Sequence, residues 1–124
     1  MGTRTLTLEQ ILTPIEQASE QAAAAVAANT DILATILTPI APPCLFRIQI
    51  CVDTAARFRA MITRTVAGLT NTQPYIFNDD TDLTADAGYM FDLLVHANDT
   101  INFQFNVLVN NLRIFRVQEI GAGA

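Results

Sequence analysis

Hydrophobic residues follow two different spacings along this chain, and the change falls at Cys44. From position 14 to position 37 they recur every three or four residues through an alanine-rich stretch, which is the period of an α-helix. After Cys44 they alternate with polar residues in short runs, as at 101–107, which is the period of a β-strand. The pattern therefore predicts a mainly β protein with one long N-terminal α-helix.

Start and stop signals flank the predicted helix. Thr13 is suited to cap it, Pro14 suits the first helical position, and Pro39 ends it. These boundaries divide the chain into a helical segment, a stiff proline-rich linker, a β module and a small-residue tail, at residues 1–38, 39–43, 44–120 and 121–124.

One stripe of the predicted helix has the 3-4-3-4 spacing of a coiled coil. The stripe consists of Ile11, Ile15, Ala18, Ala22, Ala25, Asn29, Ile32 and Ile36. Isoleucine at both seam positions favours trimers, and one buried asparagine can fix the register and the oligomeric state. The stripe predicts a homotrimer that associates through this helix. The alternative is a single helix packed on its own β module, because the apolar stripe is wide.

Six strands are predicted after the linker. They cover residues 44–52, 56–66, 73–78, 87–96, 100–109 and 112–120. Their number and spacing are typical of an antiparallel β-sandwich, jelly-roll-like in form, or of a small barrel. The alternating apolar residues on one side of each strand would form the core.

Amide and guanidinium groups are predicted to stand together on the outer faces of the strands. They belong to Arg57, Arg59, Asn102, Gln104 and Asn106. Such groups suit planar hydrogen bonding to a sugar or to a neighbouring subunit. The simpler interpretation is an ordinary solvated face.

Residues able to carry out catalysis are scarce. Ser19 is the single serine and His96 the single histidine, so we expect neither a serine hydrolase nor a histidine-rich metal site. Cys44 and Cys51 fall in one predicted strand and point to opposite faces, so we expect two free thiols. The sequence thus predicts a protein that is not an enzyme.

One acidic run is a candidate calcium site. Asp80, Asp82 and Asp86 fall at alternate positions, as oxygen ligands of calcium often do. Ala85 stands where an EF-hand needs glycine, and no glutamate closes the loop, so an EF-hand is excluded. An irregular calcium loop and a solvated acidic loop remain as alternatives, and no other cofactor is expected.

Charge and hydropathy narrow the list of partners. The net charge of -5 provides no electrostatic footprint for nucleic acid. The most apolar window contains Asp31 and ends in prolines, so we expect no membrane span. Residues 1–9 lack the apolar core of a signal peptide. Hydrophobic residues make up 51% of the chain, which favours contact with partner subunits.

The closing strands resemble those of a class of viral proteins. The runs FDLLV at 91–95, NDTINFQF at 98–105 and LRIFRVQEI at 112–120 are similar to the last strands of small virion surface proteins. That class comprises capsid decoration proteins and head or tail fibres of tailed phages and archaeal viruses. The resemblance implies a non-enzymatic virion protein, assembled in the host cytoplasm with other virion proteins and often trimeric. The alternatives are a carbohydrate-binding β-sandwich module and a subunit of a cellular surface filament or appendage.

Overall fold

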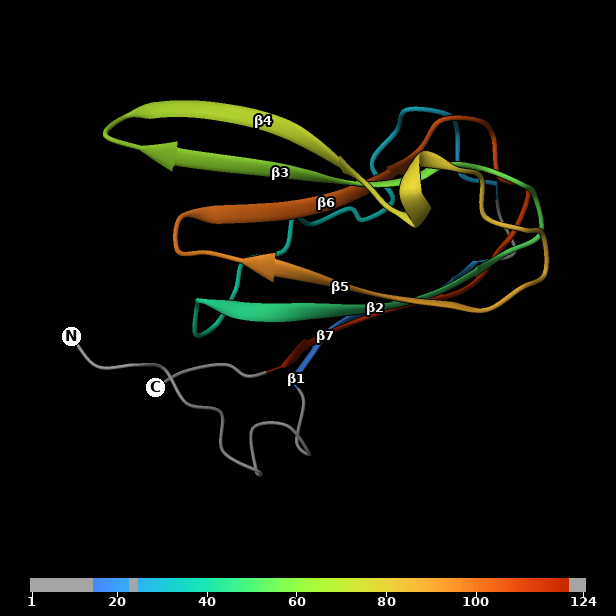
Figure 1. Cartoon of the computed structure of the whole chain (residues 1–124), viewed down its shortest axis with the longest axis horizontal. Coiled ribbons are helices and arrows are strands. Elements are labelled where there is room, and N and C mark those ends of the chain that lie inside the picture. Colours follow the sequence, from blue (N-terminus) through green and yellow to red (C-terminus); the bar gives the residue numbers. More distant parts are fainter. Residues whose placement is uncertain (1–14, 23–24, 121–124) are drawn as a thin grey trace.

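The computed structural model describes residues 15–22 and 25–120. Seven β-strands form two antiparallel sheets, one in the order β1-β7-β2-β5 and the other in the order β4-β3-β6 (Figure 1). The strands are β1 Ile15–Ala22, β2 Cys44–Val52, β3 Phe58–Val66, β4 Leu69–Ile76, β5 Tyr89–Val95, β6 Asp99–Phe105 and β7 Leu112–Ile120. A single 3₁₀ turn, Asn78–Asp80, follows β4. The predicted total of six strands is therefore wrong, because β1 precedes the six strands that follow residue 43.

The predicted N-terminal helix is also wrong, because β1 occupies part of its range and pairs antiparallel with β7. No α-helix occurs in the described residues. A register shift between Glu16 and Ala18 explains part of the error. Ala18 lies opposite Val117, whereas Ile15, three residues earlier, lies opposite Glu119. A bulge of this kind lengthens the two-residue spacing of a strand and so imitates a helical period.

The predicted coiled coil is also wrong, because the described residues of its seam form no helix. Ala18 lies on β1 and packs against the core. Ile15 and Ala22 are the end residues of the same strand, and Ile11 lies outside the described residues. The other four positions, Ala25, Asn29, Ile32 and Ile36, lie on an irregular segment. Alanine has the highest helix propensity of the amino acids, but propensity is a small energetic preference, and pairing with a neighbouring strand overrides it here.

Residues 25–37 cover the free edge of β6. Isolated bridges join Val26 to Val109 and Leu37 to Ile101. Between them, the N–H of Ile32 donates to the carbonyl of Phe103 at 2.8 Å. Counted as an irregular strand beside β6, the segment completes eight elements, in the orders β1-β7-β2-β5 and residues 25–37, β6, β3, β4. This is the connectivity of a jelly roll, which consists of two Greek keys.

The two sheets bury an aromatic core between them. Every second residue of β2 is buried. On β3 the buried residues are Phe58 and Ala60, and β6 buries Ile101, Phe103 and Phe105 on its inner side. Phe58 lies at the centre, with ring centroids 5.1 to 6.3 Å away in five neighbouring phenylalanines. Such ring pairs add to the stability that burial alone provides.

The two long sides of this sandwich differ. On one side, residues 25–37 cover β6 next to β1. On the other side, β4 and β5 end their sheets, and all eight residues of β4 are exposed. In Figure 1 the β3–β4 hairpin extends past the ends of the other strands. This uncovered hairpin is the candidate functional surface.

Candidate functional site

A two-residue turn shapes the β3–β4 hairpin. Ala67 and Gly68 have φ values of +52° and +78°, and the flanking residues Val66 and Leu69 lie opposite each other. Turns with two positive φ values match the twist of paired strands and favour glycine. On the outer face, cross-strand threonine hydroxyls lie 2.9 and 3.0 Å apart, in the pairs Thr63–Thr72 and Thr65–Thr70. The hairpin is thus a regular ladder that holds its side chains in fixed rows.

The inner face of the hairpin carries apolar residues that are buried near the core and become exposed towards the turn. Phe58 and Ala60 are fully buried, and Ile62 and Val66 follow on the same face of β3. Leu69, opposite Val66, is 78% exposed, and Val66 is 54% exposed. Ile62, Val66 and Leu69 line a hollow of about 610 Å³. The rest of its lining consists of Arg64, Ala67, Asn71 and Gln73.

The one ionic group in this lining is already paired. Nε of Arg64 donates to Oδ1 of Asp99 at 2.7 Å, and Nη2 donates to Oδ2 at 3.1 Å. Asp99 is 2% exposed and also accepts a hydrogen bond from the N–H of His96 at 3.1 Å. The hydrogen bonds from Arg64 lower the pKa of the Asp99 carboxyl and raise the pKa of Arg64. The hollow therefore combines apolar and amide side chains with one neutralised guanidinium.

The predicted outer face of amides and guanidinium groups is largely bonded to the chain itself. Nη2 of Arg59 donates to Asn29 at 2.7 Å and to Gln104 at 2.8 Å. Nε2 of Gln104 donates to Asp31 at 2.8 Å. Asn106 accepts a hydrogen bond from the backbone N–H of Arg57 at 2.8 Å. Most of these contacts fasten residues 25–37 and the neighbouring loops.

Asn102 is the most buried of these residues, at 5% exposure. Its Oδ1 accepts from the N–H of Leu33 at 3.1 Å, and its Nδ2 donates to the carbonyl of Leu33 at 2.9 Å. The side chain thereby acts as a backbone partner for the irregular segment. The sequence pattern picks out Asn102 as a candidate site residue. It cannot predict the partner, because Leu33 lies 69 residues away and no local pattern connects the two.

The carboxylates of the acidic run do not converge. Arg57 forms ion pairs with Asp80 and Asp82, at 3.4 and 3.7 Å, while Arg113 pairs with Asp86 at 2.7 Å. Within 15–22 and 25–120, no group of three or more histidine, cysteine, aspartate or glutamate side chains could hold a metal ion. These carboxylates therefore give no support to a calcium site.

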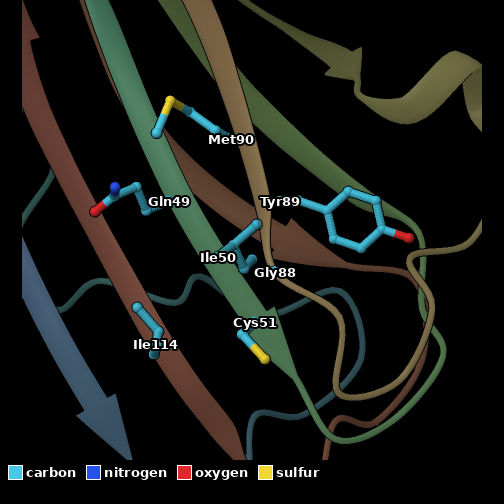
Figure 2. A pocket seen from close by; sticks show the side chains of 7 residues that line it. All are labelled: Gln49, Ile50, Cys51, Gly88, Tyr89, Met90 and Ile114. Atoms are coloured by element: carbon cyan, nitrogen blue, oxygen red, sulfur yellow. The ribbon is translucent and has the colours of Figure 1, made fainter.

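Neither cysteine forms a disulfide; Cys44 is buried, and Cys51 is partly exposed. It lies on the outer face of the four-stranded sheet in a shallow hollow of about 370 Å³ (Figure 2). Ile114 lies opposite Cys51 on β7, and Gln49 and Met90 line the same hollow farther along the strands (Figure 2). The lining of this hollow contains no histidine, arginine or carboxylate, so nothing in it activates the thiol.

Comparison with protein-family models, with curated proteins and with solved structures finds no match to this chain. Among the residues that the structure describes, no helix has the length and apolar character needed to cross a membrane. A functional proposal must therefore follow from the strand order and the surfaces of the molecule.

Proposed function

We propose that this chain is a non-enzymatic structural subunit that assembles with copies of itself, as a capsid decoration or fibre-like protein of a virion. The observation that supports the proposal is the strand order, in which the sheet β1-β7-β2-β5 faces a second layer formed by residues 25–37, β6, β3 and β4. Jelly-roll sandwiches with this connectivity form many capsid domains. Because one fold serves many functions, the exposed surfaces have to provide independent support.

Exposed apolar side chains provide that support. Val66 and Leu69 lie opposite each other on the hairpin, and Met90 and Ile114 line one hollow on the outer sheet face, on either side of β2. Chains that remain single seldom leave grouped apolar residues in water, and such groups commonly mark contacts with other proteins. Two exposed groups on one small sandwich favour assembly.

The expected mode of assembly changes with the fold. The argument for a trimer depended on the isoleucine seam, and so did the expected helical anchor. With β1 and residues 25–37 built into the two sheets, we propose that the subunits meet through their strands. The proposal keeps self-association and other virion proteins as partners, and it leaves out the coiled coil.

The carbohydrate-binding alternative has weaker support. Jelly-roll sandwiches also form lectin domains, which is in its favour. However, the polar atoms expected to meet a sugar, on Arg59, Asn102 and Gln104, already bond to other parts of the chain. No observation favours the cellular filament over the virion.

Two measurements test the proposal. Light scattering coupled to gel filtration, over roughly a hundredfold range of concentration, should give a molar mass that rises above the 13.5 kDa of one chain. A mass of 13.5 kDa at every concentration contradicts self-assembly. Virus particles banded from the source on a density gradient should contain the chain in immunoblots. Its absence from such particles contradicts the virion role and leaves self-assembly standing.

A further inference from the structure

We propose that two copies of this chain meet through the inner face of the β3–β4 hairpin, hairpin against hairpin about a two-fold axis. We call this surface the hairpin face, and it consists of Ile62, Val66, Leu69, Asn71 and Gln73. The inference rests on the proposed self-assembly and names the surface that carries it.

The hairpin face continues the apolar side of the core, but in the described part of the chain no opposite sheet covers its exposed residues. Along β3, Phe58 and Ala60 have no exposed surface, while Val66 on the same side is 54% exposed. In a sandwich such positions face the other sheet. Here β3 pairs with β6 only as far as Arg64, opposite Asp99, and the hairpin continues beyond that point (Figure 1). A second hairpin would supply the missing layer.

Charge favours a second copy at this face. The chain carries a net charge of -5, so two copies repel each other over most of their surfaces. No aspartate or glutamate occurs between Asp53 and Asp79, a stretch that contains the whole hairpin. The guanidinium of Arg64 beside the face is bonded to Asp99. Two hairpin faces can therefore approach without bringing free charges of the same sign together.

The chemistry of the face is also self-complementary. A two-fold contact places the same surface on both subunits, so each group has to suit its own copy. Apolar side chains, here Ile62, Val66 and Leu69, meet that condition. The amides of Asn71 and Gln73 meet it as well, because an amide both donates and accepts hydrogen bonds.

Packing by faces suits this hairpin better than pairing by edges. Pro74 lies on β4 and has no N–H, which interrupts the row of donors that an added strand would need. On the outer face of the hairpin, the threonine hydroxyls are already bonded to each other. The inner face is the surface of the hairpin that lacks both obstacles.

Leu69→Asp and Thr70→Asp form a matched pair for the first test. Both residues are exposed and adjacent on β4, but only Leu69 belongs to the hairpin face. We expect Leu69→Asp to weaken self-association by at least about tenfold in light scattering or sedimentation, and Thr70→Asp to leave it unchanged. Circular dichroism should show that both variants keep the wild-type fold.

The outcomes separate this inference from the broader proposal. A wild-type chain that associates, together with a Leu69→Asp variant that associates equally well, overturns the hairpin interface and leaves self-assembly standing. A wild-type chain that stays at 13.5 kDa throughout overturns both.

Disulfide trapping tests the two-fold axis, using Cys51→Ser to remove the partly exposed thiol. Asn71 lies at the centre of the hairpin face, opposite Arg64, so Asn71→Cys should give a covalent dimer under mild oxidation. Thr72→Cys, the next residue on the outer side, should not. Absence of that dimer from a chain that associates, or equal dimer from both variants, overturns the arrangement.

Discussion

Replacing Glu119 by glutamine should destabilise the protein far more than the size of the change suggests. Glu119 is 1% exposed and accepts three hydrogen bonds. Its Oε1 accepts from Nε2 of Gln17 and from the N–H of Ile40, both at 2.8 Å, and its Oε2 accepts from the N–H of Ala41 at 3.0 Å. This carboxylate therefore ties β1 and the loop that follows residues 25–37 to β7.

The magnitude follows from what glutamine cannot do. Its amide keeps one acceptor oxygen, but its NH₂ group faces at least one of the two backbone N–H donors in either orientation. A hydrogen bond to a charged group contributes about 1.5–3 kcal/mol, and a buried donor left unpaired costs about 1–3 kcal/mol. We expect the free energy of unfolding to fall by about 2–4 kcal/mol, a large part of the roughly 5–15 kcal/mol typical of a folded domain.

Urea unfolding followed by circular dichroism, at fixed protein concentration, measures this loss. Glu16→Gln is the matched control, because Glu16 lies on β1 in an exposed ion pair with Arg116 at 2.9 Å. Exposed pairs contribute about 0–1 kcal/mol, so the control should shift the midpoint little. If Glu119→Gln unfolds at the same urea concentration as Glu16→Gln, the Glu119 carboxylate does not stabilise the loop that contains Ile40 and Ala41.

Three further predictions test other parts of the structure. Asn102→Ala should lower the free energy of unfolding by about 2–4 kcal/mol, because it leaves the N–H and carbonyl of Leu33 without their partner. Hydrogen exchange in residues 25–37 should become faster, and unchanged exchange would refute the prediction. Because the pKa of Asp99 is lowered in the folded state, its contribution to stability is present above the unfolded value of about 3.9 and is lost as the pH falls through the lower folded value. Melting temperatures should therefore fall below about pH 4 in the wild type and change less in Asp99→Asn, and parallel profiles would count against the Arg64 pair. Gly68→Ala should cost about 1 kcal/mol in urea unfolding, since no atom lies within 4 Å of the added methyl group but the φ of +78° disfavours alanine; no loss would mean that the turn adapts.

Regular strands were predictable wherever one face is buried without interruption. The bounds predicted for β2 and β7 are those of the structure, because alternate residues such as Phe46, Ile48 and Ile50 are buried on one side. The start of β4 was missed, since the Ala67–Gly68 turn was not recognised and the strand begins at Leu69. The turn residues themselves were the local signal that would have corrected this.

The first quarter of the chain could not be predicted from its own pattern. The bulge at Gln17 and the alanine-rich stretch that begins at the end of β1 imitate a helical period, and only the edge of β7 makes β1 a strand. The path of residues 25–37 depends on β6, through the bridge from Leu37 to Ile101 and the side chain of Asn102. These contacts join residues more than sixty positions apart, where periodicity carries no information.

The buried polar side chains explain why an assembly surface should lie on the β4 side. Asn102 holds residues 25–37, Glu119 holds the loop that follows them, and Gln17 adds a hydrogen bond to the carbonyl of Thr38 at 3.2 Å. A partner that approached the side of β1 and residues 25–37 would have to displace these bonds, and each buried group left unpaired would oppose binding. On the β4 side, the exposed residues are Leu69, Val66 and neutral amides, and a partner displaces water from them. Residues 25–37 cover one long side of the sandwich, and we propose that a second subunit covers the other.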